Sequence, residues 1–303
     1  MSKGFRDLEE IVETNREDDI KDLKGIIEKR DEIFKKTENK VDLIEGLNQK
    51  VCKSYAGLGN AADGLHTFAN LPMSELIEKR IQFYNAENDD VTYKANDNIS
   101  KFIRPEELEK LQAEVEGKIK GLLKSLVIDI DNDHNTNDTA RRVAKMFVNE
   151  IFEGRYKTMP KVTHFPNVTG YKSIYTTGPI SIKSTCAHHF QNITGKCWVG
   201  IIPENSVIGL SKFNRIIHWL AHRPQIQEEL TSQIADELEK YSKTKHVAVV
   251  LKAEHHCMTM RGVREHESDM TTAVMRGAFM DDHATRNEFY QLLATMKGIP
   301  NGN

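Results

Sequence analysis

The strongest constraint on the fold comes from two short clusters of metal-binding residue types that lie roughly 70 residues apart. The clusters are STCAHHF (184–190) and AEHHCMTMRG (253–262). Each follows a stretch of β-branched and aromatic residues, so each is predicted to stand at the end of a strand. Their thiols and imidazoles are Cys186, His188 and His189 in the first cluster and His255, His256 and Cys257 in the second. A fold that uses both clusters must bring these two strand ends together.

The residue types favour zinc. Catalytic zinc sites use three thiolate, imidazole or carboxylate ligands and leave one position for water. Cys186, His189 and Cys257 would supply such a Cys₂His set for Zn²⁺. His188 and His255 would then be available to move protons near neutral pH. A Cys-x-His-His sequence alone would favour ordinary side chains over a metal site, and the second cluster reverses that preference.

Composition narrows the class of protein. Four cysteines among 303 residues do not make a disulfide framework. Cys52 and Cys197 have no neighbouring histidine, and Cys197 is expected to pack in the core. The charged N-terminus lacks the apolar core of a signal peptide, and no apolar run reaches the ~18 residues of a bilayer span. We therefore expect a cytoplasmic protein with no membrane partner.

The formal net charge of −3 argues against a globally basic protein that binds nucleic acid. It leaves room for a local cationic pocket that binds a phosphorylated small molecule.

Residues 1–100 are predicted to form a helical extension and linker, and residues 101–303 the main domain. The first 50 residues hold 11 Lys/Arg and 14 Asp/Glu, so half of them are charged. Apolar residues at spacings of three, four and seven predict amphipathic helices. They are Ile20, Leu23, Ile27 and Phe34, then Ile44, Leu47 and Val51. We expect a break at 57–64, a helix over 74–84 capped by Ser74, and a linker at 85–100.

From Pro105 onward the pattern indicates an α+β domain with an antiparallel sheet backed by helices. Pro105 is expected at the first position of one helix, and Gly154 is expected to close a second helix over 139–154. A long helical stretch, 210–241, is expected to break near Pro224. Strands are predicted within four segments, which are 173–185, 195–203, 245–254 and 269–279.

The segment GLSKFNRI (209–216) opens a predicted helix. Its polar residues are Ser211, Lys212 and Arg215. Backbone N–H groups, the positive end of the helix dipole and two cations converge there, which favours an anion site. Solvated cations at an ordinary helix start are the alternative. Arg261 follows Cys257 by four residues and is expected near the metal.

Two further pairs are weaker signals. Arg142 and Lys145 are three residues apart and share one helix face. Gln227 and Glu228 lie in PQIQEELT, where a carboxylate could accept hydrogen bonds from the N–H groups of guanine. Spacing alone favours an exposed helix residue at 228.

Together these stretches resemble GTP cyclohydrolase I, the family that opens the guanine ring of GTP. The resemblance covers roughly 105–295. It rests on TARRVAKMFVNEIFEG, STCAHHFQNITGK, IPENSVIGLSKFNRI, RPQIQEELT, HHCMTMRGVR and TRNEFYQLL. Several motifs in one order over this length are far more specific than a single pattern.

The resemblance implies a role for each candidate residue. The implied zinc ligands are Cys186, His189 and Cys257, and the implied catalytic residues are His188, His255 and Ser211, the last at the ribose. The implied guanine-recognition pair is Gln227 and Glu228. The implied triphosphate contacts are Lys212, Arg215 and Arg261, with Lys145 donated by a neighbouring subunit.

It also implies the tunnelling fold, in which subunits join sheets edge to edge into a pentamer and two pentamers stack into a decamer. The implied reaction is hydrolysis of GTP, with dGTP as an alternative substrate, followed by rearrangement to 7,8-dihydroneopterin triphosphate and release of formate. This product leads to folate, pterin or 7-deazaguanine synthesis, and the sequence does not choose among them.

The chain departs from the family pattern in two places. The family motif is Cys-Glu-His-His, and Ala187 replaces the glutamate. We expect zinc binding to survive, with slower turnover or with another acid in the glutamate's place. The N-terminal extension is the second departure, and it could bind an unknown partner.

Two rivals follow. The first is a weakened relative that binds nucleotide or zinc as a scaffold or regulator. The second is the nitrile reductase of queuosine synthesis, which shares the fold and uses a cysteine nucleophile with NADPH. The paired zinc-type clusters argue against it.

Overall fold

The computed structural model describes residues 39–54, 67–88 and 93–296. The chain falls into two compact units, Met1–Asp90 and Val91–Asn303. Among the described residues, no helix is both long enough and apolar enough to cross a bilayer.

In the first unit, residues 39–54 are helical, and Ile44, Leu47 and Val51 are buried as the pattern predicts. The earlier apolar positions, Ile20 to Phe34, and the break at 57–64 lie outside the described residues. A second helix, α3 (Met73–Glu87), follows. The prediction that Ser74 caps it was wrong, because the helix begins one residue earlier with Pro72 in extended conformation at the N-cap. The Nε of Arg80 donates to Asn48 Oδ1 at 2.7 Å, which joins the two helices.

In the second unit, the described end of the predicted linker is fastened to the domain. The guanidinium of Arg155 donates to the carbonyls of Lys94, Ala95 and Asp97. The amide of Asn96 donates to Glu229 Oε2 at 2.7 Å. A short 3-10 turn, η1 (Ser100–Phe102), then leads into the first long helix of the unit.

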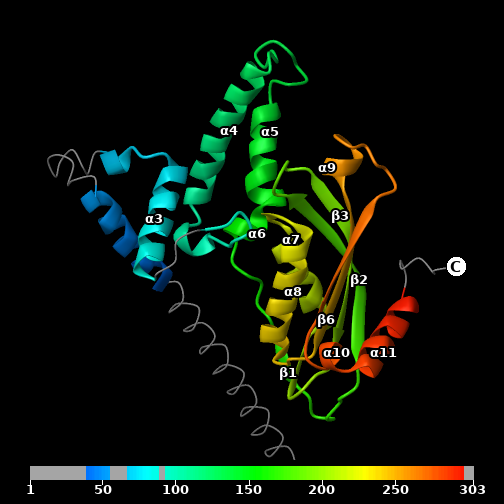
Figure 1. The fold of residues 1–303 in the computed structure, drawn as a ribbon. Helices are drawn as coiled ribbons and strands as arrows, with labels where there is room; N and C mark the ends of the chain where they lie inside the picture. Colours follow the sequence, from blue (N-terminus) through cyan, green and yellow to red (C-terminus); the bar gives the residue numbers. More distant parts are fainter. Residues whose placement is uncertain (1–38, 55–66, 89–92, 297–303) are drawn as a thin grey trace, which may run out of the picture. The chain divides into compact units, whose positions relative to one another are not determined.

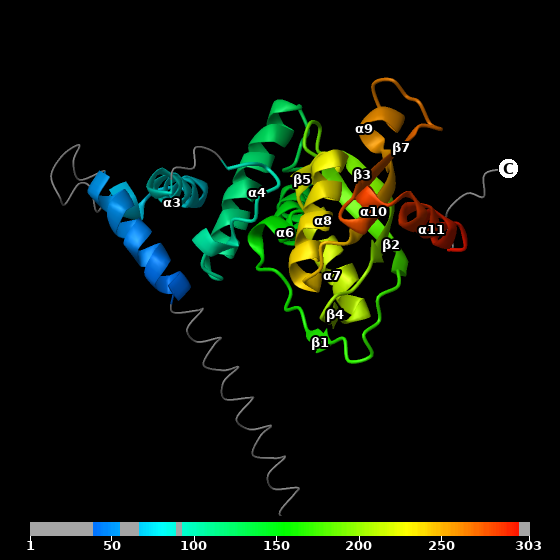
Figure 2. The ribbon, with the colours of Figure 1, turned by 60° about the horizontal axis from the view of Figure 1, so that its bottom comes forward.

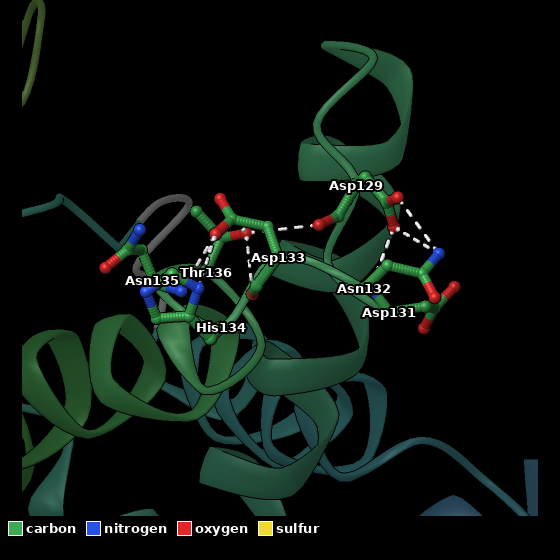
Figure 3. A network of polar contacts seen from close by, with 7 residues as sticks. All are labelled: Asp129, Asp131, Asn132, Asp133, His134, Asn135 and Thr136. Atoms are coloured by element: carbon green, nitrogen blue, oxygen red, sulfur yellow. Dashed lines mark hydrogen bonds and ion pairs between the residues drawn. The ribbon is translucent and has the colours of Figure 1, made fainter.

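That helix, α4 (Glu107–Ser125), forms a hairpin with α5 (Thr139–Lys145). Pro105 lies just before the helix rather than at its first position. Figure 3 shows how the connecting loop is held by its own side chains. The carboxylate of Asp129 accepts from the N–H groups of Asp131 and Asn132, and that of Asp133 accepts from the Asn135 N–H. These hydrogen bonds within the loop stabilise the reversal of chain direction between α4 and α5.

The single helix expected over 139–154 is three pieces. They are α5, a π-helix η2 (Met146–Ile151) and a short helix α6 (Glu153–Tyr156). Gly154 therefore lies inside α6 and does not end a long helix. A Cβ at Gly154 would sit 1.9 Å from the carbonyl oxygen of Trp219. Glycine is needed for this close approach of two backbones.

The main sheet has the strand order β5-β2-β3-β6-β7. All neighbours are antiparallel except β2 and β5, which are parallel. The strands are β2 (Tyr175–Cys186), β3 (Asn192–Ile201), β5 (Pro224–Gln225), β6 (Val247–His255) and β7 (Asp269–Met275). Two short strands, β1 (His164–Pro166) and β4 (Ser206–Ile208), pair separately. The expected strands and the break near Pro224 are confirmed.

Two helices, α7 (Leu210–Ala221) and α8 (Gln227–Ser242), cover one face of the sheet (Figures 1 and 2). Cys197 is fully buried in the core between them and the sheet, as predicted, and burial raises the pKa of its thiol. The other face packs through Trp198 and Val250 against α10 (Ala278–Asp281) and α11 (His283–Ala294). This is the α+β architecture expected from the sequence, a curled antiparallel sheet backed by helices.

Two sheet edges are unpaired among the described residues. The outer edge of β7 has no neighbouring strand, and β5 covers only Thr185 and Cys186 of β2. Unpaired edges of this length invite pairing with another chain.

Candidate metal centre and substrate residues

The two Cys/His clusters meet because of strand direction. β2 and β6 both run antiparallel to β3, so they run parallel to each other and finish at the same end of the sheet. β2 ends at Cys186, and β6 ends at His255. A short helix, α9 (His256–Thr259), follows β6 at this end (Figure 1). We call it the metal end of the sheet.

At the metal end, the ligand atoms of Cys186, His189 and Cys257 all lie within 4.8 Å of one another. The turn after β2 is fixed by its backbone: the Phe190 N–H donates to the Cys186 carbonyl at 2.9 Å. The N–H of Ala187 donates to the carbonyl of Gln225, which ties the turn to β5. Cys186 is buried, Cys257 is half-buried and His189 is exposed. Two thiols and one imidazole in this arrangement match the donor set of zinc.

Burial raises the pKa of Cys257, and the neighbouring Cys186 raises it further, because two thiolates repel each other. A divalent cation between the two sulfurs would remove that penalty. The electrostatics of the pair therefore suit a cation site.

The two remaining histidines differ in their surroundings. His188 is exposed, with Nδ1 3.8 Å from Cys186 Sγ. His255 is half-buried, and its Nε2 lies 2.8 Å from Gln227 Oε1. Burial lowers the pKa of His255, while the nearby carboxylate of Glu228 opposes this shift.

Gln227 and Glu228 begin α8 next to the metal end. The carboxylate of Glu228 is exposed. The side chain of Gln227 is completely buried, and its amide NH₂ is within hydrogen-bonding distance of three acceptors on β6 and β7. Of this pair, Glu228 therefore has the side chain that is free to meet a ligand.

Arg261 follows α9 and is exposed near the metal end. Lys145 is exposed at the end of α5, two residues before Phe147. The ring of Phe147 lies 6.1 Å from that of Phe190, which places this segment beside the turn that follows β2. Arg142, on the same helix, pairs with Asp138 at 3.0 Å.

Ser211, Lys212 and Arg215 lie at the opposite end of the sheet. The start of α7 is beside the start of β2, where the rings of Phe213 and Tyr175 are 6.2 Å apart. Tyr175 and Cys186 are the two ends of a 12-residue strand, roughly 35 Å apart at the usual rise per residue. The Nζ of Lys212 donates to the carbonyl of Lys161 at 2.9 Å. Within one chain, these three residues therefore lie far from the metal end.

The sequence did not single out the aromatic residues around the turn that follows β2. Phe190 follows His189 directly and has a positive φ of 53°, which is rare for a bulky residue. Its position beside the histidine pair was the available signal, but its packing partners Phe147 and Phe152 come from another segment.

Comparisons of the sequence with known proteins identify relatives of this chain. Residues 115–294 match the sequence model of the family GTP cyclohydrolase I. A protein of Shewanella sp. strain W3-18-1 named GTP cyclohydrolase 1 is 40% identical over 182 residues, which are 60% of this chain and 85% of that protein. A protein of the same name from Shewanella baltica strain OS185 is also 40% identical and is covered over 84% of its length. The first 114 residues lie outside the matched family range.

Proposed function

Because the chain belongs to the GTP cyclohydrolase I family and is an enzyme of the hydrolase class, we propose that it converts GTP to 7,8-dihydroneopterin triphosphate and formate with the help of zinc. The observation that supports this most directly is the convergence of Cys186, His189 and Cys257 from two strand ends. The same family resemblance leaves dGTP as an alternative substrate.

The residues present fit a zinc ion. Two cysteines and one histidine are a known ligand set for catalytic zinc, and they come from two rigid strand ends and a short turn. When bound at such a site, zinc acts as a Lewis acid that makes water reactive at neutral pH. This chain's own contribution is to hold the three ligands, to orient GTP and to move protons.

Proton transfer is assigned to the two histidines that are not ligands. His188 is exposed beside Cys186 and can donate a proton to a ring nitrogen of the guanine. His255 is held by Gln227 and can accept a proton as the ring opens. The exposed carboxylate of Glu228 is the group that accepts hydrogen bonds from the N–H groups of the guanine.

In this proposal, the phosphate and ribose residues are supplied by a second subunit. Ser211, Lys212 and Arg215 lie at the far end of the sheet from the metal, so they cannot reach a nucleotide held at the metal end of the same chain. We propose that they face the metal end of a neighbouring subunit. Arg261, and Lys145 donated by a neighbouring subunit, complete the triphosphate contacts. The unpaired edges of β2 and β7 give such subunits a way to join, as pentamers and then a decamer.

The experiment that tests the function uses the full-length protein loaded with one equivalent of zinc. It is incubated with GTP, and formate and, after oxidation, neopterin fluorescence are measured. We expect both products, and we expect a chelator and the Cys257→Ser variant to abolish both. Stoichiometric zinc and GTP binding without either product would favour the scaffold reading, for which the absence of the family glutamate at Ala187 is the supporting observation.

A further inference from the structure

We propose that Gln227 is a positioning residue that holds His255 in one tautomer, with Nε2 protonated and Nδ1 left as the proton acceptor. This inference rests on the proposed function for the identity of the reaction. It gives Gln227 a role different from reading the guanine through its side chain.

The orientation of the Gln227 amide follows from its partners. Its Nε2 lies 3.1 Å from the Leu251 carbonyl oxygen, 3.0 Å from the Met270 carbonyl oxygen and 3.1 Å from Thr272 Oγ1. Carbonyl oxygens only accept hydrogen bonds, so the amide group facing them must be the NH₂ and not the oxygen. A flipped amide would place its oxygen against two carbonyl oxygens inside a fully buried site.

The tautomer of His255 follows from that orientation. With its NH₂ turned to the strands, Gln227 presents Oε1 to His255 Nε2 at 2.8 Å. An amide oxygen has no hydrogen to donate, so Nε2 of His255 must carry the proton. A neutral imidazole has one N–H, and Nδ1 therefore holds the free lone pair. The hydrogen bond at one ring nitrogen thus determines which nitrogen reacts.

The support for Gln227 is rigid. The residue is the first of α8, and its NH₂ joins the backbones of β6 and β7. The hydroxyl of Thr231, one turn along α8, donates to the Gln227 carbonyl at 2.7 Å and lies 2.7 Å from Thr272 Oγ1. The amide that orients His255 is therefore fixed by a helix and two strands.

The fixed tautomer of His255 matters for proton transfer. When Nδ1 takes a proton from the reacting molecule, the ring becomes an imidazolium, and Oε1 still accepts from Nε2–H. The proton returns from Nδ1 to the product as the reaction proceeds, so the histidine ends in its starting tautomer. His188 has no such amide partner among the described residues. The two histidines are thereby distinguished, one fixed and one exposed.

The test compares Gln227→Met with two other variants. Methionine keeps the volume and removes the acceptor. We expect kcat to fall between about 10-fold and 100-fold, by analogy with groups that orient the ligands of a metal. KM for GTP should change less than about 3-fold. Glu228→Gln, at the proposed guanine contact, should raise KM instead. Thr272→Val removes one of the three acceptors of the amide but keeps the bond to His255, so it should lower kcat by less than Gln227→Met does.

A second readout does not depend on turnover. Solid-state NMR of zinc-loaded protein labelled with ¹⁵N-histidine should show His255 protonated only at Nε2, and Gln227→Met should give a mixture of tautomers. The signal is assigned by its loss in His255→Asn. A His255 protonated at Nδ1 in the parent, or a Gln227→Met variant with raised KM and unchanged kcat, would overturn the proposal. If the parent protein releases no formate from GTP, the proposed function fails, while the NMR result still decides whether Gln227 sets the tautomer.

Discussion

The ring of Phe190 lies 5.5 Å from the ring of Phe152 and meets it edge on, at 71°. Phe147 completes the group, 5.3 Å from Phe152 and 6.1 Å from Phe190. These contacts fasten the turn that carries His189 to the π-helix and the residue that follows it. They also hold Phe190 in a left-handed conformation that an L-residue adopts only under constraint.

Removal of the Phe190 ring should loosen the metal site. We expect Phe190→Ala to weaken zinc binding about 10-fold, since aromatic pairs contribute about 0.5–1.5 kcal/mol each and two are lost. Competition with a chromophoric chelator measures this. Phe190→Gly is the matched control, because it also removes the ring but relieves the backbone. Parental affinity in both variants would show that the ring does not position the ligands.

Restoration of the family glutamate should leave the metal site intact and change the rate. Ala187 is half-buried next to Cys186, and its backbone N–H bonds the Gln225 carbonyl. In Ala187→Glu we expect unchanged zinc content and a kcat for formate release about 10-fold higher, as for other groups beside a metal's ligands. Ala187→Gln has the same size without the charge and should gain less. Equal rates in all three proteins would mean that a carboxylate has no importance at this position.

The end of α4 carries backbone strain that glycine would relieve. Val127 has φ of 61° just after the helix, and its side chain is 91% exposed, so it gains no packing in return. A left-handed conformation costs a β-branched residue about 1–2 kcal/mol. Glycine removes this cost, but it also makes the unfolded chain more flexible, which offsets part of the gain in stability. Val127→Gly should therefore stabilise the protein by about 0.5–1 kcal/mol in urea unfolding. Val127→Ala keeps a Cβ and should gain less than the glycine variant; an equal gain would contradict the argument from strain.

Tyr175 should make stability sensitive to alkaline pH. Its hydroxyl is buried and has no hydrogen-bond partner among the described residues, and burial raises its pKa from 10.0 to about 12. Because the folded-state pKa is the higher one, the unfolded chain loses its proton first. The free energy of unfolding is therefore unaffected by the titration of this group below pH 10, and it falls as the pH rises from 10 to about 12.

Tyr175→Phe should remove this part of the alkaline loss and stabilise the protein by about 1 kcal/mol at pH 7, because no buried hydroxyl is left without a partner. Chemical unfolding at a series of pH values from 8 to about 11.5 measures both effects. A variant with the same pH profile as the parent would assign the alkaline loss to other groups.

The sequence was sufficient for those parts of the site that depend on residue type and strand direction. Cys186, His189 and Cys257 could be grouped because two strand ends with complementary ligands have few ways to be used together. The burial of Cys197 and the alternation of the strands followed from hydrophobicity alone.

Other features needed coordinates because they depend on neighbours far along the chain. Gly154 was expected to end a helix, but its lack of a side chain instead allows the Trp219 carbonyl to approach closely. The amide of Gln227 looked available for a ligand, yet acceptors on β6 and β7 occupy it. The separation of Arg215 from the metal end depends on the path of α7 along β2, which no local pattern encodes.

That separation has a genetic meaning. Suppose that every reaction centre takes its metal ligands from one copy of the chain and its phosphate contacts from the next. Each copy then contributes to two centres, and a mutation in one set of residues leaves the other set intact. A chain that has lost Cys257 still offers an intact Arg215 to its neighbour, and a chain that has lost Arg215 still offers an intact Cys257. Two inactive versions, expressed in one cell and mixed in one particle, would rebuild working centres at their shared boundaries. With such shared centres, complementation between alleles would follow from the chain's geometry.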